Sequence, residues 1–322
     1  MNSNLIYIGV DVAKDKLDIY VPTWCSKTIA NSSRSIKAFL RQLSKHLGSE
    51  RTGLVCVEPT GGYERTMLQC CWELEVGVCR IDAWQARRYA QSFGILEKTD
   101  KLDAQIIARF AEQRKIPALA KPSVQQIKLR EIWRTRQAVS KQSFALQNLL
   151  ALTVDEDAAK ILRKTLNMFE KRIAELEDLC EKIVKSDKRM KRLYKCFLEV
   201  KGVGKVTIIN TLAEIPEIGT LTRRRISKLA GLAPIADDSG TRSGQRHIRK
   251  GRSAARNGMY MAALSASSYN DILSAFYKKL IAGGKPRKVA LTAVMRKLLI
   301  CLNSIAAESD REAMLIEDEI AC

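Results

Sequence analysis

The distribution of predicted strands divides the chain into two unequal parts. Residues 5–10 (LIYIGV) form a short apolar run and residues 17–21 (LDIYV) alternate in hydropathy, so they predict two strands joined as a hairpin. Two more strands and three helices are predicted at 53–59, 76–82, 35–47, 64–75 and 100–113. Interleaved strands and helices indicate an α/β domain with a central sheet. Beyond residue 121 the strand pattern ends, and the rest of the chain is predicted to be mainly helical.

Apolar residues follow a heptad pattern in the middle of the chain. They are spaced alternately four and three residues apart, at Leu162, Leu166, Phe169, Ile173, Leu176, Cys180 and Ile183. A seam sustained over three heptads predicts a coiled coil, here as an antiparallel helical hairpin. We expect this arm to be a spacer or an oligomerisation element.

The charge of the chain is concentrated in one block. The formal net charge is +20, and residues 221–300 alone carry +14, from 17 Lys and Arg against 3 Asp and Glu. Phosphate is the natural ligand of such a block, because binding it releases condensed counterions. An anionic membrane is a weaker alternative, since the arginines lie among glycines and serines instead of on an amphipathic helix. A solvated face without a ligand is the third reading.

These patterns predict four regions. They are an α/β domain (1–120), a helical arm (121–190), a basic, mainly helical domain (191–300) and an acidic tail that frays as a helix (301–322).

Several functional classes are disfavoured. The first residues lack a basic segment before their apolar stretch, and Arg296 and Lys297 interrupt the best membrane-span candidate, so a cytoplasmic protein is expected. The nine cysteines include no CxxC pair and are expected to be reduced and mostly buried. With only His46 and His247, neither a structural zinc site nor a Ser-His-Asp triad is expected.

Four carboxylates stand where the predicted strands and a helix begin or end. Asp11 ends the first strand, Glu58 ends a buried strand, and Asp100 and Asp103 share one face at the start of a helix. Each alone is explained by solubility, turn formation or helix capping. Together they can converge on one edge of a sheet, where two divalent cations about 4 Å apart would stabilise phosphodiester displacement.

The sequence around these acids resembles a known family. The segments YIGVDVAK, VCVEPTGGYE and KTDKLDAQIIA resemble the N-terminal domain of the DEDD transposases, which include the Piv-type DNA invertases and bridge-RNA-guided recombinases. The resemblance implies a RuvC-like, ribonuclease-H-type fold with a mixed central sheet. It also implies that Asp11, Glu58, Asp100 and Asp103 bind Mg²⁺, with Mn²⁺ as a substitute.

A serine in the basic block has a further implied role. Ser239 lies in APIADDSG, which resembles the C-terminal transposase domain of the same family, and the resemblance makes Ser239 the nucleophile of a covalent phosphoserine link to DNA. Local sequence alone favours a turn serine. Ser243 and Ser253 are rejected because they do not occupy the matching position. Lys250 departs from the pattern, in which a glycine is expected before Gly251.

The basic residues and glycines of the last part supply the predicted nucleic-acid contacts. Residues 202–205 (GVGK) resemble a helix-hairpin-helix turn, and the arginines after Ser239 are expected to stabilise charge on the phosphate. The predicted contacts are Gly202, Gly204, Lys205, Arg242, Arg246, Arg249, Lys250, Arg252, Arg256, Lys285, Arg287 and Lys288.

Taken together, the sequence predicts a site-specific DNA recombinase or transposase. The expected partners are donor and target DNA, a structured non-coding RNA implied by the resemblance, and further copies of the chain in a dimer or tetramer. No membrane partner is expected. The alternatives are a metal-dependent junction-resolving nuclease, in which Ser239 is structural, and a non-catalytic nucleic-acid-binding protein.

Overall fold

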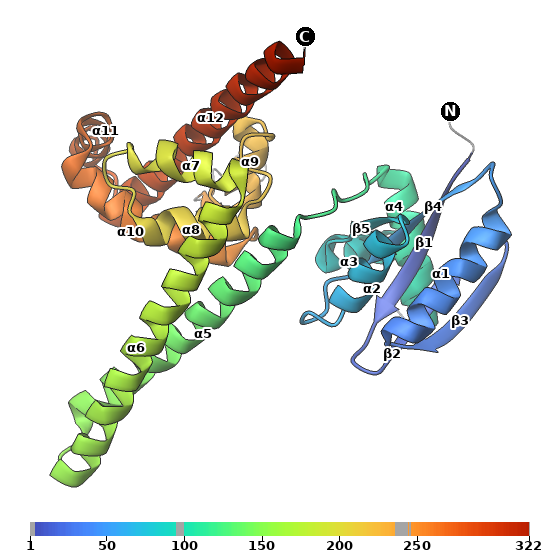
Figure 1. The fold of residues 1–322 in the computed structure, drawn as a ribbon, viewed down its shortest axis with the longest axis horizontal. Helices are drawn as coiled ribbons and strands as arrows, with labels where there is room; N and C mark the ends of the chain where they lie inside the picture. Colours follow the sequence, from blue (N-terminus) through green and yellow to red (C-terminus); the bar gives the residue numbers. More distant parts are fainter. Residues whose placement is uncertain (1–3, 95–99, 236–243, 245, 322) are drawn as a thin grey trace. The chain divides into compact units, whose positions relative to one another are not determined.

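The computed structural model describes residues 4–94, 100–235, 244 and 246–321, with only the backbone of 100–102 and 317–321. It consists of two compact units, residues 1–121 and 122–322 (Figure 1). Each unit has its own apolar core.

The first unit contains a mixed five-stranded sheet. Its strands are β1 (Leu5–Val12), β2 (Lys16–Val21), β3 (Cys25–Ala30), β4 (Thr52–Val57) and β5 (Gly77–Arg80). They are arranged in the order β3-β2-β1-β4-β5, with β1, β2 and β3 antiparallel and β4 and β5 parallel to β1. The predicted hairpin and the mixed α/β class are confirmed. Strand β3 was not predicted, because it is a largely exposed edge strand without a buried alternating face.

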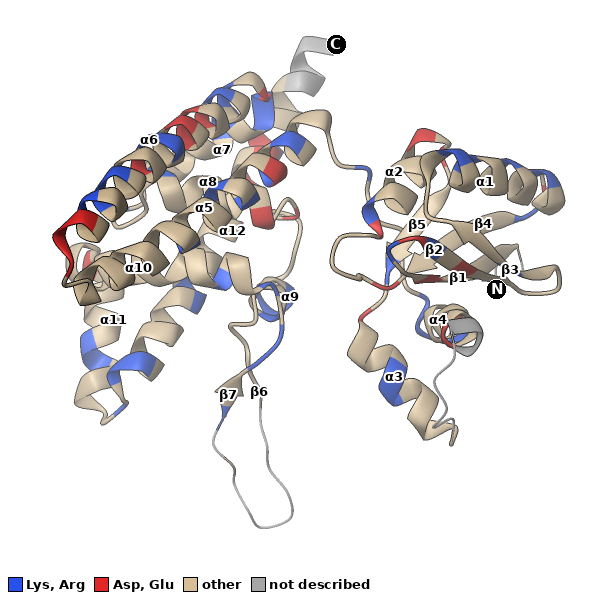
Figure 2. Cartoon of the chain, turned by 90° about the horizontal axis from the view of Figure 1, so that it is seen from below, with Lys and Arg blue, Asp and Glu red and all other residues tan. Residues whose placement is uncertain are grey.

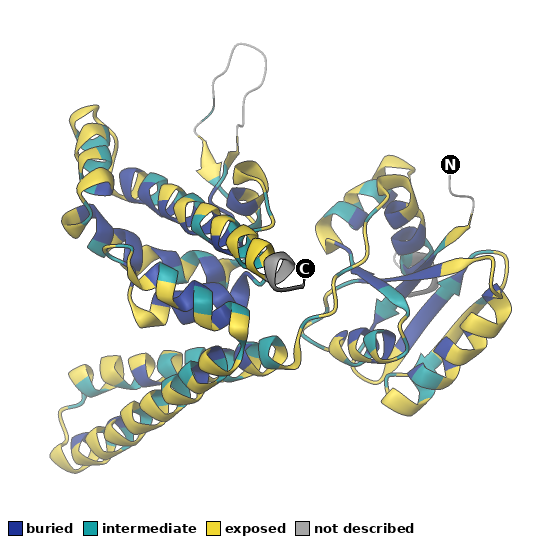
Figure 3. Cartoon of the chain, turned by 45° about the horizontal axis from the view of Figure 1, so that its top comes forward, coloured by how far each residue is buried: buried dark blue, intermediate teal, exposed yellow. Residues whose placement is uncertain are grey.

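Helices cover both faces of this sheet. They are α1 (Ser33–Leu47), α2 (Arg65–Glu73), α3 (Ala83–Ser92) and α4 (Asp100–Arg114). Val10 of β1 belongs to the core formed with α1 and α2, whereas Tyr7 packs with Ile107 and Phe110 of α4 on the opposite face. Figure 3 shows the strands of the sheet largely buried. Helix α3 was not predicted; its sequence buries only two alanines, Ala86 and Ala90.

The arm of the second unit is an antiparallel pair of long helices, α5 (Val124–Leu152) and α6 (Glu156–Ser186). Ser123 and Asp155 cap their N-termini through side-chain oxygens. The heptad residues of α6 are buried or half-buried, which confirms the predicted seam.

The rest of the second unit is a helical domain around one core. Its elements are α7 (Lys188–Leu198), α8 (Lys205–Glu214), α9 (Arg223–Leu229), β6 (Pro234–Ile235), β7 (His247–Ile248), α10 (Ser253–Tyr269), α11 (Asp271–Ala282) and α12 (Arg287–Ala321). Helix α12 is the one described helix long and apolar enough to span a membrane, at a mean hydropathy of 1.6 over its best window. Half of that window is buried, and Val294, Leu298 and Leu302 are fully buried, so this is the core helix of the domain.

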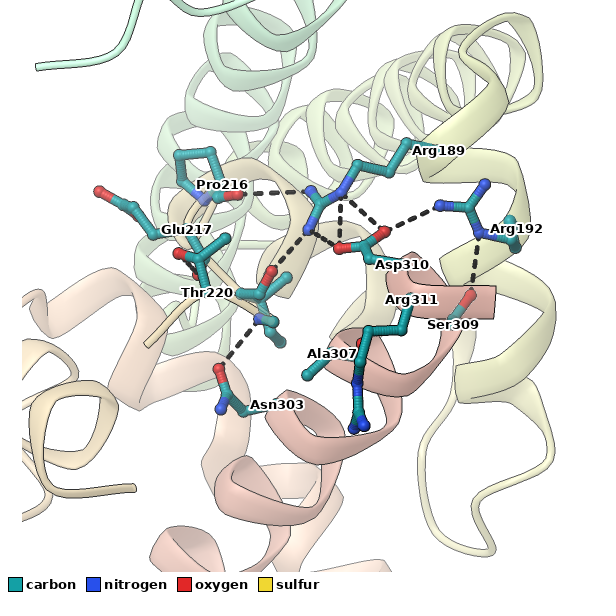
Figure 4. Close-up of polar contacts among 12 residues, drawn as sticks. Arg189, Arg192, Pro216, Glu217, Thr220, Asn303, Ala307, Ser309, Asp310 and Arg311 are labelled. Carbon is teal, nitrogen blue, oxygen red and sulfur yellow. Dashed lines mark hydrogen bonds and ion pairs between the residues drawn. The ribbon is translucent and has the colours of Figure 1, made fainter. Parts of the chain in front are cut away.

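The acidic end of the chain differs from the frayed tail that was expected. Helix α12 continues through residue 301, and Ser309 is buried. Asp310 accepts hydrogen bonds of 2.7 Å from Arg189 and 2.8 Å from Arg192 of α7, and Arg189 also donates to the carbonyl of Ile218 (Figure 4). These contacts fasten the helix to the domain as far as residue 310.

The eight described cysteines are all free thiols. Five of them are buried, and Cys301 is the one that is exposed. The expectation of reduced, mostly buried thiols is therefore confirmed for this part of the chain.

Candidate active site and nucleic-acid interface

Two of the predicted acids lie at the same edge of the sheet. Strands β1 and β4 are parallel, and Val10 of β1 is in register with Val57 of β4. Asp11 and Glu58 each follow these paired residues, so they occupy neighbouring positions where the two strands end. Both side chains are half-buried. The convergence expected from the sequence is present for this pair.

A glycine allows the third acid to approach the sheet. A Cβ atom at Gly9 would lie 1.8 Å from the carbonyl oxygen of Ala104, so helix α4 packs directly on β1 at this point. Asp11 points to the same face as Gly9, because side chains two residues apart in a strand share a face. Asp103 precedes Ala104 and is half-buried. The tight packing therefore brings Asp103 to the face of the sheet that carries Asp11.

The fourth acid, Asp100, is the first residue of α4 and lies one turn before Asp103. Its side chain lies outside the described residues. Among the described residues, no group of three or more His, Cys, Asp or Glu side chains is close enough to hold a metal ion. The donor set nevertheless fits Mg²⁺ chemically, since hard divalent cations prefer carboxylate oxygens. Asp11, Glu58 and Asp103 are the described residues that would hold it, with Asp100 completing the set.

A further acid at this site was missed in the sequence. Asp18 of β2 pairs directly with Asp11 across the antiparallel strands and is 5% exposed. Lys16 lies 3.2 Å from its carboxylate, and the Thr28 hydroxyl donates a hydrogen bond to it. Directly opposed like charges destabilise a sheet unless a cation offsets them. The sequence contained a signal for this acid. Leu17 and Ile19 are apolar and share one face of the strand, so Asp18 between them had to face the other side.

The loop after Glu58 is held by a second buried acid that was also missed. Glu64 accepts hydrogen bonds from the backbone nitrogens of Thr60 at 3.3 Å and Gly62 at 3.0 Å. Its other oxygen lies 3.4 Å from Arg80 of β5. This bracing fixes the backbone that directly follows Glu58.

Ser239 and Arg242 lie outside the described residues, but both ends of the segment that carries them are described. Strands β6 and β7 pair Pro234 with Ile248 and Ile235 with His247. His247, the nearest histidine in sequence to Ser239, is exposed in this short pair. The hairpin was not predicted, because its strands are only two residues long.

The backbone beside the hairpin explains the departure at Lys250. This residue has a φ of 60°, a left-handed conformation that favours glycine, and Gly251 follows at 70°. A Cβ atom at Gly251 would lie 2.2 Å from the backbone nitrogen of Gly231, so the two glycine turns pack in direct contact. The glycine expected at position 250 is thus replaced by a lysine in the glycine conformation.

Two of the predicted DNA-binding arginines are instead structural. Arg252 donates two hydrogen bonds of 2.7 and 2.6 Å to the carboxylate of Glu217 and a third of 2.7 Å to the carbonyl of Glu214. Arg256 donates to the carbonyl of Lys250 at 2.8 Å. Arg252 thus holds the start of α10 against the end of α8 and the segment after it, and Arg256 holds it against the turn at Lys250. The sequence cannot reveal them, because Arg252 and Glu217 are 35 residues apart.

The GVGK turn also serves packing in part. Gly202 has a φ of 95°, and a Cβ there would lie 2.6 Å from the backbone of Ala266 in α10. Lys205 pairs with Glu181 of the arm at 3.0 Å. Gly204, in contrast, has no atom within 4 Å of its Cβ position and is exposed at the start of α8. Of the predicted turn, Gly204 is the residue whose backbone has open space beside it.

The other predicted basic residues are exposed. Arg246, Arg249 and Lys250 flank β7, and Lys285, Arg287 and Lys288 lie at or before the start of α12. Figure 2 shows basic residues on α9 and next to β7, and acidic residues on β1 of the first unit. Two basic residues of α12, Arg296 and Lys297, share a pocket with Arg246 and Lys288 and were not predicted as contacts.

The sequence of the chain matches models of known protein families. The sequence model of the DEDD transposases of the IS110 type, described as a transposase, matches residues 8–159, and that of the transposase IS116/IS110/IS902 family matches residues 194–278. The pilin gene-inverting proteins of Moraxella bovis and Moraxella lacunata are each 24% identical over 312 residues, which covers 91% of this chain and 93% of theirs. T. thermophilus RuvC, solved in complex with a Holliday junction substrate, is 14% identical, with a TM-score of 0.27 over 36% of this chain and 99% of RuvC. The chain belongs to the IS110-type DEDD transposases, an enzyme family that acts on DNA.

Proposed function

We propose that this chain is a site-specific DNA recombinase that cleaves and rejoins strands through a phosphoserine at Ser239. The observation that supports the proposal is the position of Asp11 and Glu58 after the paired residues Val10 and Val57 of β1 and β4, with helix α4, which carries Asp103, packed directly on β1 at Gly9. The 24% identity to two gene-inverting proteins over most of the chain supports recombination as the outcome.

The proposed step conserves the energy of the phosphodiester bond in a new ester to serine. The Ser239 oxygen attacks the phosphorus, the bond from phosphorus to the oxygen of one strand end breaks, and that oxygen leaves as a hydroxyl. The hydroxyl of a second strand end later displaces the serine, so the energy of the diester is retained. Magnesium at the acids supplies Lewis acidity when it is bound. Among the arginines, Arg246 is exposed beside β7 and can stabilise phosphate charge, whereas Arg252 is committed to Glu217.

The test is a search for the covalent protein–DNA adduct. The substrate is a supercoiled plasmid with the chain's own mobile element and its flanks, and reactions are resolved on a denaturing gel. The unsubstituted protein is expected to form an adduct, and Ser239→Ala is expected to form none. Ser253→Ala, at an exposed position beginning α10, is the matched control and should retain it. Hydrolysed ends without any adduct would instead identify a metal-dependent nuclease.

We further propose an RNA partner and an oligomer, in the cytoplasm where the element's DNA lies. The arm exposes large apolar side chains that a second copy could cover, among them Phe144, Leu152 and Ile161. Sequencing the nucleic acid that co-purifies with the protein tests the first proposal, since a discrete RNA matching the element's flank is expected. Light scattering tests the second, because a monomer at all concentrations would contradict it.

A further inference from the structure

A pocket beside the β6–β7 hairpin has no role in the chemistry described so far. Its volume is about 510 Å³, and it is lined by α12, by Phe276 of α11 and by residues of the hairpin. The wall contains apolar side chains, including Leu232, Ile248, Phe276 and Ile300. The volume falls within the range of about 300–1,000 Å³ typical of small-molecule sites.

Four cationic side chains line the same pocket. Arg246 comes from beside β7, and Lys288, Arg296 and Lys297 come from α12. The three α12 residues belong to two adjacent rows of residues spaced four apart, which share one helix face. Lys297 is held over the Phe276 ring, with its nitrogen 4.4 Å from the ring centroid, and Arg296 donates to the Ser227 hydroxyl at 3.4 Å.

These cations are available to an anionic ligand. The ion pairs among the described residues include none of the four side chains. An apolar guest alone, such as a side chain of another copy, would leave four cations without counter-charge. A guest with a flat, weakly polar ring and an attached phosphate satisfies both the wall and the cations.

We propose that this pocket binds one unpaired nucleotide of a DNA strand, with the base against the apolar wall and its phosphate among Arg246, Lys288 and Arg296. A pocket of about 510 Å³ has room for one base but not for a base pair within a duplex, so the nucleotide must leave the stack. The choice of DNA rests on the proposed function, because the segment that carries Ser239 begins directly after Ile235, next to the pocket residue Pro234. A nucleotide held here would fix the strand beside Pro234, five residues before Ser239 in the sequence.

The probe is a DNA duplex with a single bulged 2-aminopurine, compared with the same duplex fully paired and with an abasic bulge. Binding to the full-length Ser239→Ala protein is measured by anisotropy in EDTA, so that no chemistry contributes. We expect the base-containing bulge to bind about tenfold more tightly than either comparison duplex, as the binding of one base by a protein surface allows. The 2-aminopurine fluorescence is expected to change on binding.

Variants separate the pocket from general DNA binding. Ala293→Phe fills the pocket from a half-buried position of its lining without altering charge. Val289→Glu places an acid at an exposed position of the same lining. Both are expected to abolish the bulge preference while fully paired DNA still binds. Lys279→Gln, which removes an exposed charge on α11 outside the pocket, is the matched control and should keep the preference. Thermal unfolding shows whether Ala293→Phe still folds, and the surface variant Val289→Glu provides an independent readout.

Three results would overturn the proposal. They are equal binding of the bulged and paired duplexes, a bulge preference that survives Val289→Glu, and an equal or greater preference for the same bulge in RNA. Loss of binding to every DNA would instead count against the proposed function. The pocket proposal predicts only the difference in affinity between the bulged and the paired duplex.

Discussion

The two units differ in how their charged residues are used. The first unit has a net charge of only +4 over residues 1–120, yet two of its acids, Asp11 and Glu58, occupy neighbouring positions where β1 and β4 end. In the second unit, several bases are bound internally, as Arg252 is by Glu217 and Arg189 by Asp310. An acid at a strand end is placed by the backbone, whereas the role of a base depends on its tertiary partners. Net charge therefore locates a polyanion-binding region but does not identify the binding residues.

The largest expected effect comes from Gly9→Ala in the first unit. The new Cβ would lie 1.8 Å from the carbonyl oxygen of Ala104, so α4 must move away from β1. Overpacking of this kind is expected to cost about 3 kcal/mol of unfolding free energy. Displacement of Asp103 from Asp11 is expected to reduce strand cleavage about 100-fold. Denaturant unfolding and a cleavage assay measure the two effects.

Gly204→Ala is the control for the stability effect. Its φ is −96°, and no atom lies within 4 Å of its Cβ position, so the unfolding free energy should fall by only about 0.5–1 kcal/mol, because alanine is a poorer N-cap of α8 than glycine. A Gly9→Ala protein with full stability and activity would show that the close contact of α4 with β1 does not position the acids.

The second largest expected effect concerns the ion pair between Glu217 and Arg252 in the second unit. Partial burial raises the pKa of Glu217, but the hydrogen bonds and charge of Arg252 lower it more, and the net pKa is below its usual value. Removing the carboxylate in Glu217→Ala is expected to cost about 2 kcal/mol of unfolding free energy, allowing for its partial exposure. Denaturant unfolding at pH 7 measures this loss.

The same pair gives a pH dependence with a defined sign. A carboxyl whose pKa is lowered on folding stabilises the protein above its unfolded pKa of about 4.3, and this contribution is lost as the pH falls through the folded value. The gap in stability between the unsubstituted protein and Glu217→Gln should therefore narrow below about pH 4. A gap that stays constant to pH 3 would contradict the assignment of Arg252 as a structural residue.

The outcome of the sequence predictions follows the same division. The β1–β2 hairpin and the α6 heptad were predictable because a periodic pattern records which face is buried. Strand β3 could not be predicted because it is an exposed edge, and the β6–β7 pair because it is too short for periodicity. Asp11 and Glu58 were located because both follow runs of buried, mostly apolar residues. Asp18 was missed because its relation to Asp11 depends on strand register.

The sequence also could not show which basic residues are bonded within the unit and which remain exposed. Arg252 is bonded to Glu214 and Glu217, which are distant in sequence, and Arg256 is bonded to carbonyls of the turns next to the hairpin. Arg296 and Lys297 were read as an interruption of an apolar run. Their spacing from Lys288, which puts the three residues on one helix face, was visible in the sequence. The structure adds that this face lines a pocket.

A third prediction concerns Asp18, the acid that pairs with Asp11. Asp18→Asn removes one negative charge at the proposed magnesium site, so the Mg²⁺ concentration for half-maximal cleavage is expected to rise about tenfold, equivalent to about 1.4 kcal/mol. The rate at saturating Mg²⁺ should change little. Cleavage measured across a Mg²⁺ titration gives both values.

Asp15→Asn is the matched control for Asp18. Asp15 is exposed in the turn between β1 and β2, where solvent screens its charge, so its substitution should leave the titration unchanged. An unshifted titration for Asp18→Asn would mean that Lys16 already neutralises the charge of Asp18.

The smallest expected effect is at Lys250, where a predicted DNA contact and a strained backbone coincide. A non-glycine residue at a φ of 60° is strained by about 1–2 kcal/mol, and glycine removes this strain. Glycine also loses more conformational entropy on folding, which offsets part of the gain. Lys250→Gly is therefore expected to raise the unfolding free energy by about 0.5 kcal/mol, whereas Lys250→Ala should give no such gain.

Both variants remove the same charge, so an equal loss of DNA affinity in the two would assign that loss to the ammonium group. Equal stability of the two variants would show that the left-handed turn beside the hairpin carries no strain, and unchanged affinity in both would remove Lys250 from the DNA-binding residues of the basic unit.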